Sequence, residues 1–151
     1  MDLGIKGRKA FLMASSSGLG LACAKALAAE GVDVWLNARN AERLEAAAEE
    51  VRKVATGQVR TIAADLTVEG DRQRIFAEIP EVDILVTNNE GPTPGSLENW
   101  DHDAWVGAFE KNMIPHALFI RNYVGGMRAR KFGRIVNITS DSFSDRSEER
   151  R

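Results

Sequence analysis

The chain has 151 residues, of which 44% are hydrophobic and 28% charged, and its formal net charge is −2. This length can bury one hydrophobic core, so we expect one soluble globular domain, and the small net charge gives no overall attraction to nucleic acid or to an anionic membrane. A single cysteine excludes an internal disulfide. With no signal-like or membrane-length apolar stretch, this predicts a cytoplasmic protein.

Short apolar runs alternate with segments of helical periodicity along the chain. Strands are expected at 9–13, 32–36, 59–63, 82–86 and 134–138. Helices are expected at about 21–29, 40–57, 69–79 and 104–130. Strands that alternate with helices predict an α/β fold with a doubly wound parallel sheet.

Two of these helices carry further signals. Asn40 is expected to cap the second helix and Gly57 to stop it. Its apolar face would consist of Leu44, Ala47, Ala48, Val51, Val54 and Ala55. The long fourth helix contains Pro115, so we expect a bend near that residue.

A run of small residues follows the first expected strand. It reads Ala14-Ser15-Ser16-Ser17-Gly18-Leu19-Gly20 and leads directly into a helix. A helix start offers unpaired N–H groups, and glycines let the backbone approach a ligand without a Cβ in the way. The run therefore predicts a pocket for the phosphates of a dinucleotide. The alternative is a tight turn that packs the helix on the strand and binds no ligand.

The motifs that follow later strands suggest a family. Arg39, Asp65-Leu66, Asn88-Asn89-Glu90-Gly91 and Ser140 each follow an expected strand. With these motifs in this order, the chain resembles the short-chain dehydrogenase/reductase family, especially its 3-oxoacyl-carrier-protein reductase-like branch. The resemblance runs from Ala14 to Ser140, and family members are usually much longer.

The resemblance implies a particular fold and domain plan. The sheet would be Rossmann-like, with the strand order 3-2-1-4-5 and without the later strands of the family. Residues 1–143 would form a dinucleotide-binding domain and residues 144–151 a polar tail. No internal repeat or linker divides the chain further.

The resemblance also assigns the phosphate end of the site. The family motif Thr-Gly-x-x-x-Gly-x-Gly has Ala14 in place of its first glycine, and we expect Ala14 to require a negative φ. Arg39 stands where the family selects its cofactor, and a guanidinium there would clamp a 2′-phosphate, which favours NADP(H). Alone, Arg39 would be an ordinary surface arginine.

Other matching residues would surround the rest of the cofactor. Asp65 and Leu66 match the segment that contacts adenine, although Asp65 or Thr67 could instead cap the next helix. Asn88 and Gly91 match residues that line the ribose on the nicotinamide side. Glu90 replaces an alanine there and brings a negative charge toward a phosphate-bearing ligand.

Two residues match the family's catalytic groups. Asn112 would hold a water in a proton relay, and Ser140 would hydrogen-bond the substrate carbonyl. Their alternatives are an exposed helix residue and an ordinary strand-end hydroxyl. The Tyr-x-x-x-Lys pair of the family would follow Arg151. The single tyrosine, Tyr123, has Met127 at the fourth position after it and is no substitute.

Two functions remain open from these residues. The first is an NADPH-dependent oxidoreductase that reduces a small-molecule ketone, with a 3-oxoacyl thioester as one candidate. The second is a truncated, non-catalytic module that binds a dinucleotide or forms an oligomer.

The remaining signals concern partners. A homo-oligomer is expected, because the long helix often forms the dimer face in such proteins. The basic residues 128–131 are expected to be a solvated helix end, with docking of an acidic carrier protein as the alternative. His102 and His116 are isolated, so the sequence predicts no metal site, and it contains no nucleic-acid-binding motif.

Overall fold

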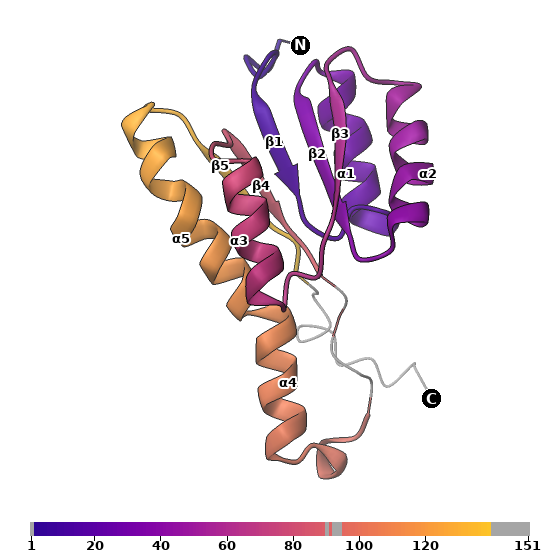
Figure 1. Cartoon of the computed structure of the whole chain (residues 1–151), viewed down its shortest axis with the longest axis vertical. Helices are drawn as coiled ribbons and strands as arrows, with labels where there is room; N and C mark the ends of the chain where they lie inside the picture. Colours follow the sequence, from indigo (N-terminus) through magenta and orange to yellow (C-terminus); the bar gives the residue numbers. More distant parts are fainter. Residues whose placement is uncertain (1, 90, 92–94, 140–151) are drawn as a thin grey trace.

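The computed structural model describes residues 2–89, 91 and 95–139. Glu90, Ser140 and the expected boundary after residue 143 lie outside these residues. The described part forms one five-stranded sheet with the order β3-β2-β1-β4-β5 (Figure 1). All pairings between neighbouring strands are parallel. The strands are β1 (Lys9–Leu12), β2 (Asp33–Ala38), β3 (Val59–Ala63), β4 (Ile84–Thr87) and β5 (Arg134–Asn137). The predicted α/β class and strand order are confirmed.

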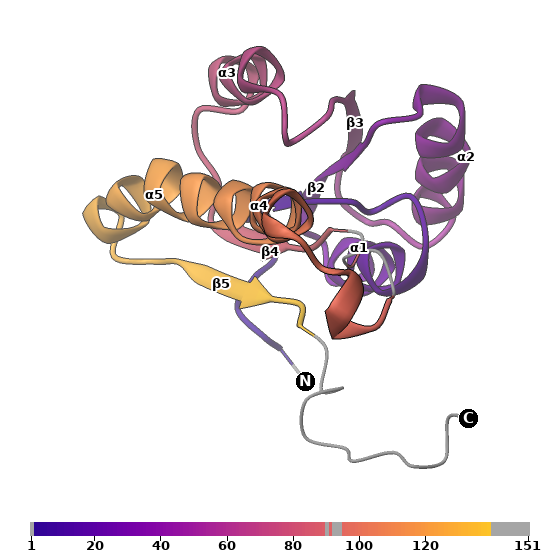
Figure 2. The ribbon, with the colours of Figure 1, turned by 90° about the horizontal axis from the view of Figure 1, so that it is seen from below.

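Helices cover both faces of the sheet (Figure 2). On one face lie α1 (Gly18–Ala29) and α2 (Ala41–Arg52), and on the other α3 (Glu69–Glu78) and α5 (Ile114–Ala129). The short 3₁₀ helix η1 (Leu97–Asn99) and α4 (His102–Asn112) precede α5. Within the described residues, no helix is long and apolar enough to cross a bilayer.

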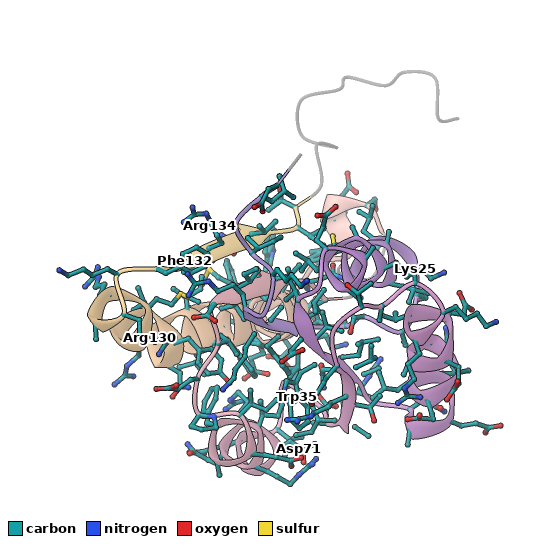
Figure 3. All side chains as sticks on the ribbon, turned by 90° about the horizontal axis from the view of Figure 1, so that it is seen from above. Lys25, Trp35, Asp71, Arg130, Phe132 and Arg134 are labelled. Carbon is teal, nitrogen blue, oxygen red and sulfur yellow. The ribbon has the colours of Figure 1, made fainter. Side chains whose placement is uncertain are left out.

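Two hydrophobic clusters hold the layers together. The first contains Leu12, Val34, Leu44 and other residues of β1, β2, α1 and α2. The second lies under α3 and α5, where the rings of Phe11 and Phe119 stack with their centroids 5.3 Å apart. Figure 3 shows Trp35 on the face of the sheet that α3 covers. Burial on both faces of the central strands explains their continuous apolar sequences.

The second helix starts as predicted but ends early. The Asn40 side chain caps α2 by accepting a hydrogen bond from the backbone N–H of Arg43 at 2.8 Å. The helix ends at Arg52, so the prediction that Gly57 stops it is wrong. Gly57 lies instead against β2, where a Cβ would come within 2.7 Å of the Val32 carbonyl oxygen. Val54, expected on the apolar face, is 45% exposed.

The long helix expected at 104–130 is two helices, α4 and α5, that meet at Met113. Pro115 occupies the first turn of α5, where its missing N–H is tolerated. Within one continuous helix, residue 115 would donate to the carbonyl of Lys111, and proline cannot do so. The Lys111 carbonyl instead accepts a hydrogen bond from the Asn89 side chain. The break between the helices therefore allows a hydrogen bond between the end of α4 and the residue that follows the end of β4 by two positions.

Candidate functional site

A cleft of about 480 Å³ opens at the carboxyl ends of β1, β2, β3 and β4. In Figure 1 the strand ends point toward the side of the sheet where α4 lies. The described residues that line the cleft come from the end of β2, from the loops after these four strands, and from α1, α2 and α4. They are Ala14, Ser16, Ser17, Gly18, Leu19, Asn37, Ala38, Arg39, Asn40, Arg43, Ala64, Asp65, Leu66, Thr67, Asn88, Asn89 and Lys111.

The turn between β1 and α1 forms one wall of the cleft. Ser17 is the N-cap of α1, but its side chain makes no capping hydrogen bond. The first N–H groups of α1 have no partner in the preceding turn of the helix, and the helix dipole is positive at this end. Gly18 has a φ of +55°, a conformation that glycine adopts readily. This wall has the chemistry that suits a phosphate group.

Ala14 adopts a φ of +46°, so the expectation of a negative φ is wrong. Residues on both sides of it are fixed. Met13 N–H donates to Val86 at 3.0 Å, and Ser15 N–H donates to Asn37 at 2.8 Å. The Ala14 carbonyl also accepts a hydrogen bond from the Asn88 side chain at 3.2 Å. These bonds hold an L-residue in the left-handed region at a cost of about 1 kcal/mol or more.

Two of the predicted cofactor-binding residues shape the turn without lining the cleft. Ser15 is fully buried, and its hydroxyl donates to the Leu12 carbonyl at 3.0 Å and accepts from Asn37 N–H at 3.0 Å. Gly20 is buried against the turn, where a Cβ would come within 2.5 Å of the Ala14 carbonyl oxygen. Ser15 thus holds the turn on β2, and Gly20 lets α1 approach it.

Arg39 lies on the wall formed by the end of β2 and the start of α2. It lines the cleft and is exposed, as is Arg43 in the first turn of α2. Asn37 turns its side-chain amide away from this wall to donate to the carbonyls of Ile62 and Ala64 on the β3 side, at 3.1 and 3.2 Å. Among the described residues that line this wall, two are arginines and none has a carboxylate.

Asp65 lies across the cleft, after β3. Its Oδ1 accepts hydrogen bonds from the backbone and the hydroxyl of Thr67, at 2.9 and 2.7 Å. Burial raises the pKa of Asp65, but the Thr67 hydrogen bonds and the charges of Arg39 and Lys111 outweigh it, and the pKa lies below its ordinary value. Asp65 therefore carries a negative charge at neutral pH. Neither Asp65 nor Thr67 caps α3, whose N-cap is Val68.

The end of β4 ties the cleft walls together. Asn88 bonds to Ala14, and Asn89 bonds to Lys111 of α4. His116 of α5 hydrogen-bonds to the backbone of Asn88. Burial lowers the pKa of His116, and this hydrogen bond opposes the effect of burial. Its Nε2 atom is buried and has no hydrogen-bond partner within the described part of the chain.

The catalytic assignments are not tested by this geometry. Asn112 ends α4, and its side chain donates to the Ala108 carbonyl at 3.1 Å. Neither Asn112 nor Gly91 is among the residues that line the cleft. Ser140 lies outside the described residues.

Several residues at this site were not among the predicted site residues. The cleft is also lined by Arg43, Thr67 and Lys111. His116 does not line it but hydrogen-bonds to the backbone of Asn88, which does. Arg43 lies in the first turn of the helix that the sequence predicts after Asn40, next to the end of β2, and this position could have indicated it. Lys111 and His116 have no such signal, because the break before Pro115 determines where they lie.

Replacing Ala14 by glycine should stabilise the protein. The Ala14→Gly variant removes the Cβ that is strained at positive φ, and we expect the free energy of unfolding to rise by about 0.5–1 kcal/mol. Urea unfolding monitored by circular dichroism would measure this. The Ala14→Ser variant keeps a Cβ and should show no gain, so equal gains for both variants would contradict the explanation.

The half-buried His116 should make the protein less stable in mild acid. Its folded-state pKa is lowered, so stability is fully present above the unfolded pKa of about 6.5 and falls as the pH drops through the folded value. Between about pH 7.5 and 5.5, the His116→Gln variant should lose less unfolding free energy than the wild type. The exposed His102 is the control, since His102→Gln should change nothing. Equal losses for all three proteins would contradict this account.

Comparisons with known proteins agree with this geometry. A sequence profile of short-chain dehydrogenases matches residues 8–149. The uncharacterized oxidoreductase YvaG of Bacillus subtilis is 33% identical over 150 residues, which are 99% of this chain and 57% of YvaG. The chain thus spans little more than half the length of this curated relative.

Two solved structures share the fold. A candidate β-ketoacyl-ACP reductase superposes with a TM-score of 0.84 at 32% identity, over 94% of this chain and 58% of its own. L-sorbose reductase from Gluconobacter frateurii, in complex with NADPH and L-sorbose, has a TM-score of 0.80 at 30% identity, over 91% of this chain and 54% of its own. From the profile match and the shared fold, the chain belongs to the short-chain dehydrogenase family.

Proposed function

We propose that this chain binds NADPH and forms the cofactor-binding part of an oxidoreductase that reduces a ketone, with a 3-oxoacyl thioester as one candidate substrate. The observation that carries the proposal is the common cleft of the glycine-rich turn, Arg39 and Asp65. A cofactor-bound relative, L-sorbose reductase, supports the choice of NADPH.

The residues present fit this cofactor. The start of α1 suits the pyrophosphate, since its N–H groups and dipole favour a negative charge. The Arg39 guanidinium lines the cleft and suits the 2′-phosphate. The second oxygen of the ionised Asp65 suits the adenine amino group, because both hydrogen bonds from Thr67 use Oδ1. When bound, the nicotinamide would supply a hydride to the carbonyl carbon.

The proton chemistry needs a group other than Tyr123. This tyrosine is 2% exposed and donates a hydrogen bond to the Ile79 carbonyl at 2.9 Å. Burial raises the pKa of Tyr123 far above its ordinary value. It therefore holds α5 against the end of α3 and has no contact with the cleft. Ser140 and Asn112 keep their proposed roles at the substrate carbonyl and in the proton relay.

A carrier protein remains a proposed partner on weaker grounds. The guanidinium groups of Arg8 and Arg134 lie 3.8 and 4.8 Å from the ring centre of Phe132, and Figure 3 shows Phe132 and Arg134 together beside β5. Arg130 is engaged within the protein, because it bonds to the Val82 carbonyl at 2.7 Å and pairs with Asp83 at 3.4 Å. Part of this basic cluster thus serves the fold.

A second candidate function, an oligomer-forming module, is favoured by α4. No residue of α4 is buried, and the helix extends away from the sheet (Figure 1). Its exposed apolar side chains continue to the start of α5: Trp105, Val106, Phe109, Met113 and Ile114. An 11-residue helix is marginal without packing, and a connected apolar surface of this kind is typical of an interface. The two functions are compatible with each other.

Arg39→Gln should weaken NADPH binding by about tenfold and change NADH binding by less than about twofold, because only NADPH carries the 2′-phosphate. Fluorescence titration of each cofactor would measure this. Arg121→Gln removes the same charge from an exposed site on α5 outside the cleft and is the control. Equal losses for both cofactors would refute the phosphate clamp, and no binding by the wild type would refute the proposed function. A parallel assay of ketone reduction separates binding with turnover from binding alone.

Phe109→Asp should convert an oligomer into monomers, because it places a charge in the exposed apolar surface of α4. Light scattering during size-exclusion chromatography would measure the mass. Val54→Asp places the same charge on a similarly exposed valine elsewhere and should leave the oligomer intact. A monomeric wild type, or equal behaviour of both variants, would contradict the oligomer-forming role.

A further inference from the structure

The loop between β3 and α3 lines the cleft with residues 64–67. On the side of β2 its backbone is held by the buried Asn37, whose side-chain amide donates to the carbonyls of Ile62 and Ala64 at 3.1 and 3.2 Å. The N–H of Ala64 donates in turn to the Ala38 carbonyl of β2 at 3.0 Å. A loop that is ordered before a ligand arrives binds it more tightly, because less conformational entropy is lost on binding. These bonds order the first half of the loop.

Charged side chains of α3 hold the second half of the loop. The Asp71 carboxylate accepts a hydrogen bond from the backbone N–H of Asp65 through Oδ2, at 2.6 Å. The Arg72 guanidinium donates to the Leu66 carbonyl at 2.9 Å. Hydrogen bonds with a charged partner are roughly twice as strong as neutral ones. The two bonds together fix the backbone at both ends of the Asp65–Leu66 dipeptide.

Arg74 connects Asp71 to the end of β3. Its guanidinium donates to the Ala63 carbonyl at 2.6 Å and pairs with Oδ1 of Asp71 at 3.3 Å. Residues three apart share one side of a helix, so Asp71 and Arg74 reach the loop from the same side of α3. Asp71, Arg72 and Arg74 are not among the described residues that line the cleft. Their contacts are with the loop, so they act on a ligand through it.

We propose that Asp71, Arg72 and Arg74 are positioning residues, which orient Asp65 toward the base of the cofactor before the cofactor binds. Asp71 fixes the main chain of Asp65 and Thr67 occupies its Oδ1, so Oδ2 is aimed at one place. An adenine amino group donates to that oxygen, whereas the carbonyl of hypoxanthine at the same position meets it as a second acceptor. The selectivity for adenine therefore depends on α3. This inference rests on the proposed function, because it needs a nucleotide in the same cleft.

The test uses the complete chain, NADPH and the hypoxanthine analogue of NADPH, in which a carbonyl replaces the amino group of the base. Fluorescence titration gives the Kd of each, and the wild type should prefer NADPH by about tenfold. Asp71→Ala leaves the Asp65 N–H without its acceptor and should weaken NADPH by about fivefold and the analogue by less than about twofold. Asp71→Asn keeps an acceptor oxygen and should restore most of the preference. Glu69→Ala removes the same charge from an exposed position in the same turn and is the control.

A second readout separates the loop from the stability of the whole fold. Amide hydrogen exchange followed by NMR should show faster exchange of the Asp65 N–H in Asp71→Ala, by a larger factor than for Leu36 in the middle of the sheet. Arg72→Met removes the bond to the Leu66 carbonyl independently and should lower the preference for NADPH in the same way.

The outcomes distinguish this inference from the proposed function. If the wild type binds NADPH but Asp71→Ala and Arg72→Met keep the preference of the Glu69→Ala control, the inference is overturned while the proposed function stands. The same holds if Asp71→Ala weakens both nucleotides equally, or if the wild type does not distinguish them. If the wild type binds neither nucleotide, both are overturned.

Discussion

The carbonyl group of Ala14 is the point on which the cleft depends. It accepts the Asn88 side chain from the end of β4, and Gly20 of α1 packs so closely on it that a Cβ would come within 2.5 Å. The turn after β1, the start of α1 and the distant end of β4 thus meet at one peptide unit. Together with the backbone hydrogen bonds of Met13 and Ser15, this contact holds Ala14 at a positive φ. The resulting turn places the first N–H groups of α1 at the edge of the cleft.

The break between α4 and α5 has a comparable role on the other wall. A continuous helix would satisfy the Lys111 carbonyl internally and would leave Asn89 without this acceptor. Pro115 removes the internal donor, so a helix defect becomes a contact between α4 and β4. His116, one residue later, contacts the backbone of Asn88. The start of α5 therefore supports the two asparagines that organise the cleft.

Much of this arrangement could be predicted from the sequence. The resemblance to the family implied the strand order. The shared cleft of Ala14, Arg39 and Asp65 follows from motifs that are local in sequence, because parallel strands bring their carboxyl ends to one edge. The cap at Asn40 is equally local. These features need no knowledge of contacts between distant residues.

The errors and omissions concern distant contacts. The φ of Ala14 depends on Asn88, and the place where the long helix breaks becomes meaningful only once Asn89 is seen to bond to Lys111. Gly57 looked like a helix stop, yet it is needed for close packing on Val32. The hydroxyl of Ser15, within the predicted phosphate-binding run, is bonded to the backbone of β1 and β2. In each case a residue type was recognised, while its partner came from another part of the fold.

Helix α4 connects the exposed apolar surface with the cleft. The outer surface of α4 is apolar and has no cover in the described chain, while its last residues bring Lys111 to the cleft. A helix that buries no residue has little packing energy to hold its last turn. If a second copy covers that surface, it stabilises the helix and with it the position of Lys111. Cofactor binding and association would then be linked, and each would strengthen the other by the same free energy.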